Sequence, residues 1–232
     1  ELCPPDLLRG QEEAFARDVA RLRARAREFV AVACPACGAD EPEHGLDKSG
    51  FTWARCPRCR TLYMTPRPSP EVMGAYYAAS ENYAYWAEHI FPASAAARRD
   101  KVPRPWLERI AGYCEQYGVP LGTLVEVGPG FGTFAALAEE RFERVLAVEP
   151  TPELARACRE RGVEVVERAI EEVAEGELPP ADVVCAFETI EHLFDPRVFL
   201  EHAARIVRPG GRLVVSCPNG LGFDIAERGA TS

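Results

Sequence analysis

The sequence has very few lysines and methionines and no long apolar run. Only Lys48 and Lys101 are lysines among 27 basic residues, which we attribute to coding bias, and there are two methionines. No hydrophobic stretch approaches the roughly 18 residues that a membrane span needs, and no signal-peptide core is present. We therefore expect a soluble, cytoplasmic protein with no membrane partner.

The overall composition is that of an ordinary folded protein. Of 232 residues, 47% are hydrophobic and 27% are charged, values that exclude wholesale disorder, collagen and coiled coils. This length allows one ordinary domain together with a small module, or two small domains. Because the chain begins at Glu1 without a methionine, we expect it to be part of a longer translation product.

Basic residues are outnumbered by acidic ones, and the imbalance is local. The formal net charge is −9, and the acidic excess lies entirely in residues 121–232. An acidic half repels a phosphate backbone, so a nucleic-acid partner is disfavoured.

The nine cysteines fall into two classes. Five are isolated and scattered, which argues against a secreted disulfide framework and for a reducing compartment. The other four form two C-x-x-C pairs separated by 18 residues, the spacing of a structural zinc site with four sulfur ligands. A redox or disulfide role for the pairs is the alternative. The four predicted ligands are Cys34, Cys37, Cys56 and Cys59.

The pattern of the chain predicts four segments. Residues 1–33 form a helical segment, with apolar residues at helical spacing between Gln11 and Val32. Residues 34–65 form a zinc-ribbon-like module, and a proline-rich connector follows it. Residues 66–120 are a helical, aromatic-rich linker or lid, whose aromatic residues are either core packing or walls of a substrate pocket. Residues 121–232 are the fourth segment.

Strand and helix patterns alternate through this last segment. Short apolar runs at 124–127, 145–148, 163–166, 182–187 and 211–217 predict strands. Thr151-Pro152-Glu153 and Asp195-Pro196 are helix starts. Strands separated by helices predict an α/β fold with a doubly wound, mostly parallel sheet that is covered on both faces.

A glycine-rich turn follows the first of these strands. Its glycines, in the run Glu126-Val127-Gly128-Pro129-Gly130-Phe131-Gly132, allow a ligand to approach the backbone at the carboxyl end of the sheet. A nicotinamide fingerprint would need glycine where Thr133 stands. The acid-x-G-x-G-x-G form instead resembles the first motif of the S-adenosylmethionine-dependent methyltransferases with a Rossmann-like sheet. The resemblance implies that Glu126, Gly128, Gly130 and Gly132 contact S-adenosylmethionine.

Three later residues extend the predicted cofactor set. Glu149 closes the second strand, where a carboxylate can accept both ribose hydroxyl hydrogens. The resemblance places the adenine ring near Ala169 and Ile170, after the third strand. This sequence has Arg168 before Ala169, where many relatives carry an acid.

The run Glu188-Thr189-Ile190-Glu191-His192 after the fourth strand, with Pro209-Gly210-Gly211 before the fifth, strengthens the resemblance. It is similar to small-molecule methyltransferases, including ubiquinone-biosynthesis O-methyltransferases, over about residues 120–220. Zinc-type cysteines before such a domain further resemble methyltransferases that act on sugars and natural products.

The resemblance leads to a mechanism. The enzyme holds a small-molecule acceptor in line with the methyl group. His192 is the candidate general base because its intrinsic pKa is near neutral; a structural histidine is the alternative. Glu188 orients His192 or contacts the cofactor's amino group, unless it is simply solvated.

Two other functions are compatible with the sequence. One is a ribosomal RNA methyltransferase with a zinc module, supported only by the arginines of the N-terminal third. The other is a non-catalytic adaptor that keeps the cofactor fold without activity. A complete domain of the family adds two strands after the fifth, and only fifteen residues follow Cys217. We therefore expect the C-terminal strands to be missing, and the oligomeric state stays open.

Overall fold

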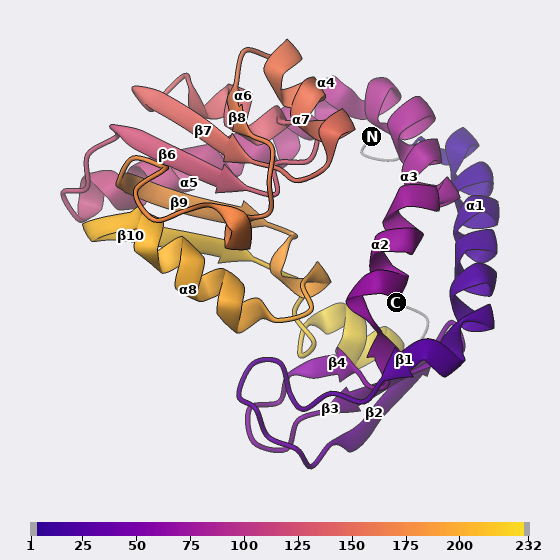
Figure 1. The fold of residues 1–232 in the computed structure, drawn as a ribbon. Helices are drawn as coiled ribbons and strands as arrows, with labels where there is room; N and C mark the ends of the chain where they lie inside the picture. Colours follow the sequence, from indigo (N-terminus) through magenta and orange to yellow (C-terminus); the bar gives the residue numbers. More distant parts are fainter. Residues whose placement is uncertain (1–3, 230–232) are drawn as a thin grey trace. The chain divides into compact units, whose positions relative to one another are not determined.

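The computed structural model describes residues 4–229, which divide into two compact units (Figure 1). Unit 1 contains the residues up to Ala95 together with the segment from Pro218 onward, and unit 2 runs from Ala96 to Cys217. None of the helices between residues 4 and 229 is long and apolar enough to cross a bilayer.

Unit 2 is built on a five-stranded, fully parallel sheet with the strand order β10-β9-β6-β7-β8. The first strand of this unit, β6, is central; the chain then moves outward to β8 and returns to β9 on the other side. This reversal of direction confirms the predicted doubly wound sheet. The strands are β6 (Thr123–Val127), β7 (Arg144–Val148), β8 (Glu164–Val166), β9 (Ala181–Phe187) and β10 (Val207–Ser216).

Helices cover both faces of this sheet. Neighbouring strand residues alternate between the two layers: Leu124 packs with Leu107 and Phe134 on one face, and Val125 packs with Phe199 on the other. The first layer is formed by α5 (Pro103–Gln116), α6 (Thr133–Ala138) and α7 (Pro152–Glu160), and the second by α8 (Pro196–Ile206) with the 3-10 turn η3 (Ile170–Glu172).

Local sequence explains where the helices of unit 2 begin. Proline occupies the first turn of α7 and α8, where its missing N–H costs nothing. The Asp195 carboxylate accepts a hydrogen bond of 3.0 Å from the Arg197 N–H and caps α8 as expected. Thr151 makes no side-chain cap; the Glu149 carboxylate accepts its N–H instead.

Unit 1 combines helices with two small antiparallel sheets. The cysteine module, which we define as residues 29–68, contains the strand pair β1 with β5 and the three-stranded sheet β2-β3-β4. Its strands are β1 (Phe29–Val30), β2 (Glu43–Lys48), β3 (Phe51–Arg55), β4 (Leu62–Met64) and β5 (Arg67–Pro68). The other elements are α1 (Pro5–Ala24), η1 (Ala26–Glu28), α2 (Pro70–Ala79), α3 (Glu81–Tyr85), the π-helical turns η2 (Trp86–Ile90) and η5 (Asp224–Arg228), and α4 (Phe91–Lys101), which crosses the boundary.

The N-terminal helix differs from the prediction. It spans Pro5–Ala24 instead of reaching Val32, because the chain after Glu28 is extended and pairs with β5. Its buried residues are Ala14 and Asp18, while Phe15 is 41% exposed. Asp18 is fully buried because its carboxylate accepts the Ser80 hydroxyl and two backbone N–H groups at the start of α3. The face of α1 that is buried is therefore selected by the capping of α3 and not by apolar periodicity.

Three further differences concern boundaries. The predicted linker of residues 66–120 ends in α5, whose Leu107, Ile110 and Cys114 lie in the core of unit 2. The fifth strand begins at Val207 and contains the predicted Pro-Gly-Gly turn as an irregularity in its pairing with β9. Among residues 4–229 no strand follows β10; the chain from Pro218 belongs to unit 1.

Candidate active site and candidate metal centre

The glycine loop after β6 has a backbone that only glycine adopts easily. Gly128, Gly130 and Gly132 have φ angles of +69°, +56° and +71°. A Cβ on Gly128 would lie 2.8 Å from the Thr189 side chain, and one on Gly132 would lie 2.8 Å from Cys158 Sγ. At Gly130 a Cβ would meet nothing within 4 Å. The loop is therefore packed at both ends and open in the middle, where a ligand can reach the main chain.

Glu126 lies below this loop with one oxygen unsatisfied. The side chain is buried, one carboxylate oxygen accepts the Ala135 N–H, and Oε2 has no hydrogen-bond partner. Burial, reinforced by the charge of Glu149, raises the pKa of Glu126 to about 8. An orphaned carboxylate oxygen beneath an open glycine loop fits a ligand that carries a donor or a positive charge, as S-adenosylmethionine does.

Replacement of Glu126 by glutamine is expected to stabilise the ligand-free protein in a pH-dependent way. Because the folded-state pKa is raised, the carboxyl group's favourable contribution is complete below its unfolded value near 4.5 and is lost as the pH rises to about 8. In urea denaturation, the free energy of unfolding of Glu126→Gln should equal that of the wild type near pH 4.5 and exceed it increasingly as the pH rises to about 8. The exposed Glu139→Gln serves as the control, and a gain that is constant with pH would contradict the assignment.

Glu149 lies at the end of β7, directly against the glycine loop. It is 4% exposed, and its Oε1 accepts the Thr151 N–H at 2.8 Å, while the Gly130 N–H also bonds to the carboxylate. Burial raises its pKa, and these N–H donors oppose the rise. The structure thus brings Glu149 to the loop as the sequence suggested, with part of its hydrogen-bonding capacity already used.

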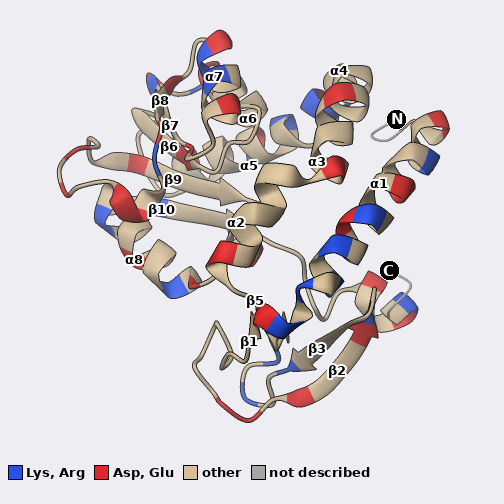
Figure 2. Cartoon of the chain, turned by 45° about the vertical axis from the view of Figure 1, so that its right-hand side comes forward, with Lys and Arg blue, Asp and Glu red and all other residues tan. Residues whose placement is uncertain are grey.

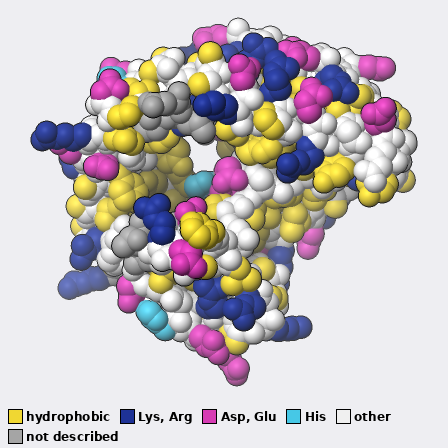
Figure 3. All heavy atoms as spheres, turned by 180° about the vertical axis from the view of Figure 1, so that it is seen from behind, with side chains coloured by type: hydrophobic (Ala, Val, Ile, Leu, Met, Phe, Trp, Pro, Cys, Tyr) yellow, Lys and Arg dark blue, Asp and Glu magenta, His cyan; other side chains and the backbone are white. Residues whose placement is uncertain are grey.

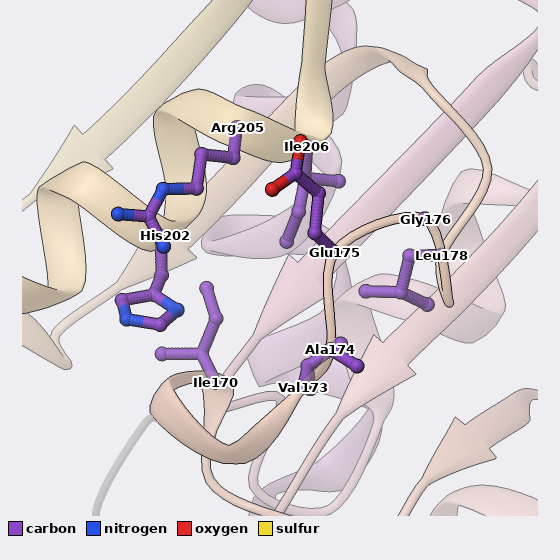
Figure 4. Close-up of a pocket in the computed structure, with 9 residues that line it drawn as sticks. All are labelled: Ile170, Val173, Ala174, Glu175, Gly176, Leu178, His202, Arg205 and Ile206. Carbon is purple, nitrogen blue, oxygen red and sulfur yellow. The ribbon is translucent and has the colours of Figure 1, made fainter.

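The segment predicted to hold adenine is mostly engaged with the protein itself. The Ala169 N–H donates to Glu172 Oε2 at 3.2 Å, and Ile170 is 3% exposed in the core layer beneath α8. Ile170 also lines a small pocket between η3 and α8, opposite His202 and Arg205 (Figure 4). The adenine contacts of Ala169 and Ile170 therefore stay a prediction, and the exposed surface of Ala169 offers the more direct access.

The carboxyl ends of β9 and β10 are joined through Glu188 and Ser216. Glu188 has a φ of +49°, an uncommon conformation for a residue with a side chain. Its N–H donates to the Ser216 carbonyl at 3.2 Å, and the Ser216 hydroxyl donates to Glu188 Oε1 at 2.8 Å. These bonds fix the Glu188 carboxylate at the strand end, next to the glycine loop that Thr189 contacts.

Glu191 and His192 follow on the 3-10 turn η4 (Ile190–His192). His192 Nε2 lies 4.0 Å from Glu191 Oε1, and the His192 side chain is 47% exposed. Partial burial lowers the pKa of His192, although the Glu188 charge opposes this shift. Burial and the neighbouring Glu188 raise the pKa of Glu191. A neutral imidazole that is accessible from solvent is suited to accept a proton.

Sequence reasoning missed three residues that shape this site. Ser216 fixes Glu188, Thr189 fills the space that a side chain at Gly128 would need, and Arg161 donates to the Phe131 carbonyl in the glycine loop at 2.8 Å. A positional signal existed for Ser216 and Thr189, because both stand at the carboxyl ends of parallel strands. Arg161 follows α7 and has no signal in a single sequence.

The structure brings the four paired cysteines together in the cysteine module. Their sulfur atoms all lie within 4.8 Å of one another, with Cys34 Sγ 3.5 Å from Cys59 Sγ and Cys37 Sγ 3.6 Å from Cys56 Sγ. Four sulfurs at about 2.3 Å from one zinc ion would be separated by about 3.8 Å in a tetrahedron. The donor set and its spacing therefore fit zinc.

The two C-x-x-C turns have the same backbone structure. In each, the first cysteine's N–H and carbonyl close the turn: Cys34 bonds to Ala39 and Gly38, and Cys56 bonds to Thr61 and Arg60, at 2.8–2.9 Å. Gly38 and Arg60 occupy equivalent left-handed positions with φ angles of +73° and +64°. Two matching turns thus present their sulfurs to one point, as the sequence predicted.

One thiol of this cluster is set up to ionise. The hydroxyl and backbone of Thr61 hydrogen-bond to Cys59 and lower its pKa to about 6. A thiolate is the form of cysteine that binds metal. The convergence of four sulfurs on one point, rather than this pKa, favours a metal site over a redox pair.

The geometry of unit 2 defines a class of protein before any comparison is made. A doubly wound parallel sheet that carries its ligand loop and acidic residues at the strand ends around the point of reversal is a nucleotide-type cofactor-binding domain. Residues 125–215 match the family model described as a methyltransferase domain. This segment is thus similar to methyltransferase domains, and its sheet has the Rossmann-like fold of class I.

Curated relatives match the same part of the chain. The ubiquinone biosynthesis O-methyltransferase of Xylella fastidiosa (strain 9a5c) is 33% identical over 109 residues, 44% of each chain. The methyltransferase tpcM of Aspergillus fumigatus is 33% identical over 117 residues, 49% of this chain and 36% of its own. The chain thus spans less than half the length of these relatives.

A solved structure supports the fold over a larger share of the chain. An S-adenosylmethionine-dependent methyltransferase from Clostridium acetobutylicum superposes with a TM-score of 0.51, covering 63% of this chain and 61% of its own, at 14% sequence identity. This likeness concerns the fold alone.

Proposed function

We propose that the protein transfers a methyl group from S-adenosylmethionine to a small-molecule acceptor of the sugar or natural-product type. The observation that carries the proposal is the open glycine loop between two buried acids, Glu126 and Glu149, in a methyltransferase domain. When bound, S-adenosylmethionine supplies an electrophilic methyl group. Similarity to the Xylella fastidiosa ubiquinone biosynthesis O-methyltransferase favours a hydroxyl acceptor.

The residues of the site divide the work. Gly128, Gly130 and Gly132 keep the loop free of side chains so that the ligand can approach the main chain. Glu126 and Glu149 supply negative charge beside the loop, and Ala169, Ile170 and Glu188 complete the predicted cofactor contacts. His192 accepts the proton that a hydroxyl acceptor loses as the new bond forms. Because its pKa is lowered, His192 is neutral and ready to act at physiological pH.

We also propose that Cys34, Cys37, Cys56 and Cys59 bind one structural zinc ion. All four coordination positions are taken by protein sulfur, so the ion has no open position for catalysis. Its contribution is to hold the cysteine module together.

The structure offers little support for an RNA substrate. Two of the arginines of the N-terminal third that suggested one are paired with acids, Arg21 with Glu81 and Arg25 with Glu28. Basic and acidic residues are interspersed along α1 (Figure 2). On the face seen in Figure 3, blue and magenta side chains are interspersed. A phosphate backbone would have to displace these ion pairs, and we therefore favour a small acceptor.

Calorimetry and mass spectrometry test the proposed function. We expect micromolar binding of S-adenosylmethionine and of S-adenosylhomocysteine, and a 14 Da mass gain on one acceptor in a screen of small hydroxylated and amino compounds. Absence of cofactor binding by correctly folded, zinc-loaded protein would favour the adaptor alternative. Transfer to RNA alone, with salt-dependent RNA binding, would favour the RNA alternative.

His192→Ala is expected to lower kcat by roughly 100-fold or more while leaving cofactor affinity unchanged, because a general base acts only in the transition state. In the wild type, kcat/KM should fall with decreasing pH only below the ordinary histidine pKa of 6.5, since the pKa of His192 is lowered. His202→Ala, at a partly buried histidine on α8 away from the glycine loop, is the matched control. Unchanged turnover in His192→Ala, or an acidic limb that persists in this variant, would remove His192 as the base.

A further inference from the structure

The segment that follows β10 packs against the cysteine module. Figure 1 shows this segment in yellow beside β4, and both belong to unit 1. The Gly220 carbonyl accepts a hydrogen bond of 3.4 Å from Arg55 Nη2. A Cβ on Gly220 would lie 2.8 Å from the Cβ of Leu62, so glycine is needed for this close approach. The contact joins residues that lie more than 150 positions apart in the chain.

Arg55 links this segment to the second cysteine turn. It immediately precedes Cys56, and its Nη1 donates to the Arg60 carbonyl at 3.3 Å. Arg60 is the left-handed residue that closes the turn through its N–H bond to the Cys56 carbonyl. One guanidinium group therefore holds the metal-ligand turn with one nitrogen and Gly220 with the other. A planar guanidinium group can donate to two carbonyl groups at fixed positions, whereas the single ammonium group of a lysine cannot.

The anchored segment continues directly from the candidate active site. Ser216, which fixes Glu188, ends β10, and only three residues separate it from Gly220. The chain then forms a compact turn, in which Asn219 accepts the N–H groups of Leu221 and Gly222 at 2.9 and 2.8 Å. Contacts between the cysteine module and Gly220 can therefore hold this turn in place without any contact to the glycine loop.

We propose that metal binding by the cysteine module orders the chain after β10, with Arg55 and Gly220 as the positioning residues. The metal fixes the turn from Cys56 to Cys59, the Arg60 carbonyl holds the Arg55 guanidinium, and Arg55 with Leu62 holds Gly220. The module therefore anchors the chain that leaves the end of β10, in addition to folding itself. This inference rests on the proposed zinc site and not on methyl transfer.

Hydrogen exchange of the full chain, read by mass spectrometry, tests the proposal. Removal of zinc with a chelator is expected to raise the exchange rates of the Leu221 and Gly222 amides by roughly tenfold or more, together with those of residues 56–62. The amides of β6 and β7 serve as the internal reference and should not change. Loss of protection in residues 56–62 with unchanged protection at Leu221 and Gly222 would overturn the proposal.

Two variants separate the anchor from the metal itself. Arg55→Met and Gly220→Ala should retain one zinc per chain and normal S-adenosylhomocysteine affinity, yet exchange faster at Leu221 and Gly222. Arg55→Lys should rescue little, because a single ammonium group cannot bridge both carbonyls. Gly74→Ala is the matched control, since a Cβ there meets nothing within 4 Å. Wild-type exchange in both zinc-loaded variants would contradict the anchor, and a wild-type protein without bound zinc would contradict the metal site.

Discussion

Gly128→Ala is expected to weaken S-adenosylmethionine binding by roughly 100-fold or more, a change of about 2.7 kcal/mol. Two costs combine at this position. The φ angle of +69° disfavours any residue with a side chain, and the new Cβ would lie 2.8 Å from the Thr189 side chain. To relieve this clash, either the glycine loop or the chain that follows β9 must move. Both belong to the proposed cofactor site. Calorimetric titration of the purified variant measures the loss.

Gly162→Ala is the control for backbone strain alone. Gly162 has a φ of +90°, and a Cβ there meets nothing within 4 Å, so the substitution costs stability without touching the glycine loop. It should lower the melting temperature and leave cofactor affinity within about twofold of the wild type. A second control removes the clash: Thr189→Ala should restore part of the affinity in the Gly128→Ala background. Wild-type affinity in Gly128→Ala would show that the loop does not hold the cofactor.

The sequence predicted unit 2 well because its signals are local and redundant. Each apolar run is bounded by a turn, and a buried parallel strand such as β6 is apolar toward both layers. The order of strands then follows from the general rule for doubly wound sheets. Glu149 was predicted at the end of the second strand, and because the carboxyl ends of parallel strands share one edge, that position brings it to the glycine loop.

Unit 1 was harder to predict because its structure depends on distant partners. The face of α1 is set by Asp18, whose buried charge pairs with Arg21 and accepts the Ser80 hydroxyl and two N–H groups at the start of α3. The end of α1 is set by the pairing of β1 with β5, about forty residues later. Neither contact leaves a periodic pattern. The cysteine turns were the exception, because a metal site imposes a fixed spacing on its ligands.

The contacts of two predicted cofactor residues, Glu188 and Ile170, also depend on distant partners. Glu188 was correctly placed at the edge of the sheet, but its bond to Ser216 requires knowledge that β10 pairs with β9. Ile170 looked available for adenine from its position after β8. Its side chain is instead buried beneath α8, since a short apolar residue after an edge strand can turn toward either layer.

Cys56→Ser is expected to unfold the cysteine module while unit 2 keeps its fold and its cofactor affinity. The module's buried cluster consists of Cys34, Ala54, Cys56 and Tyr63, so two of its four core residues are proposed metal ligands. A core of this size cannot offset the conformational entropy of about forty residues. Zinc binding contributes roughly 10–16 kcal/mol to folding in comparable peptides, and loss of one ligand removes most of that contribution. The effect on the module should therefore be close to complete.

The measurement needs a readout for each unit. Metal content by mass spectrometry should fall from one zinc per chain to none, and exchange protection should be lost across β2 to β4 but retained in β6 to β9. Cys217→Ser, at an exposed cysteine outside the module, should change neither readout. Retained protection in β2 to β4 without bound metal would show that hydrogen bonding and packing alone hold the module. In that outcome the cysteine module would fold without the metal, and the proposed structural role of zinc would be wrong.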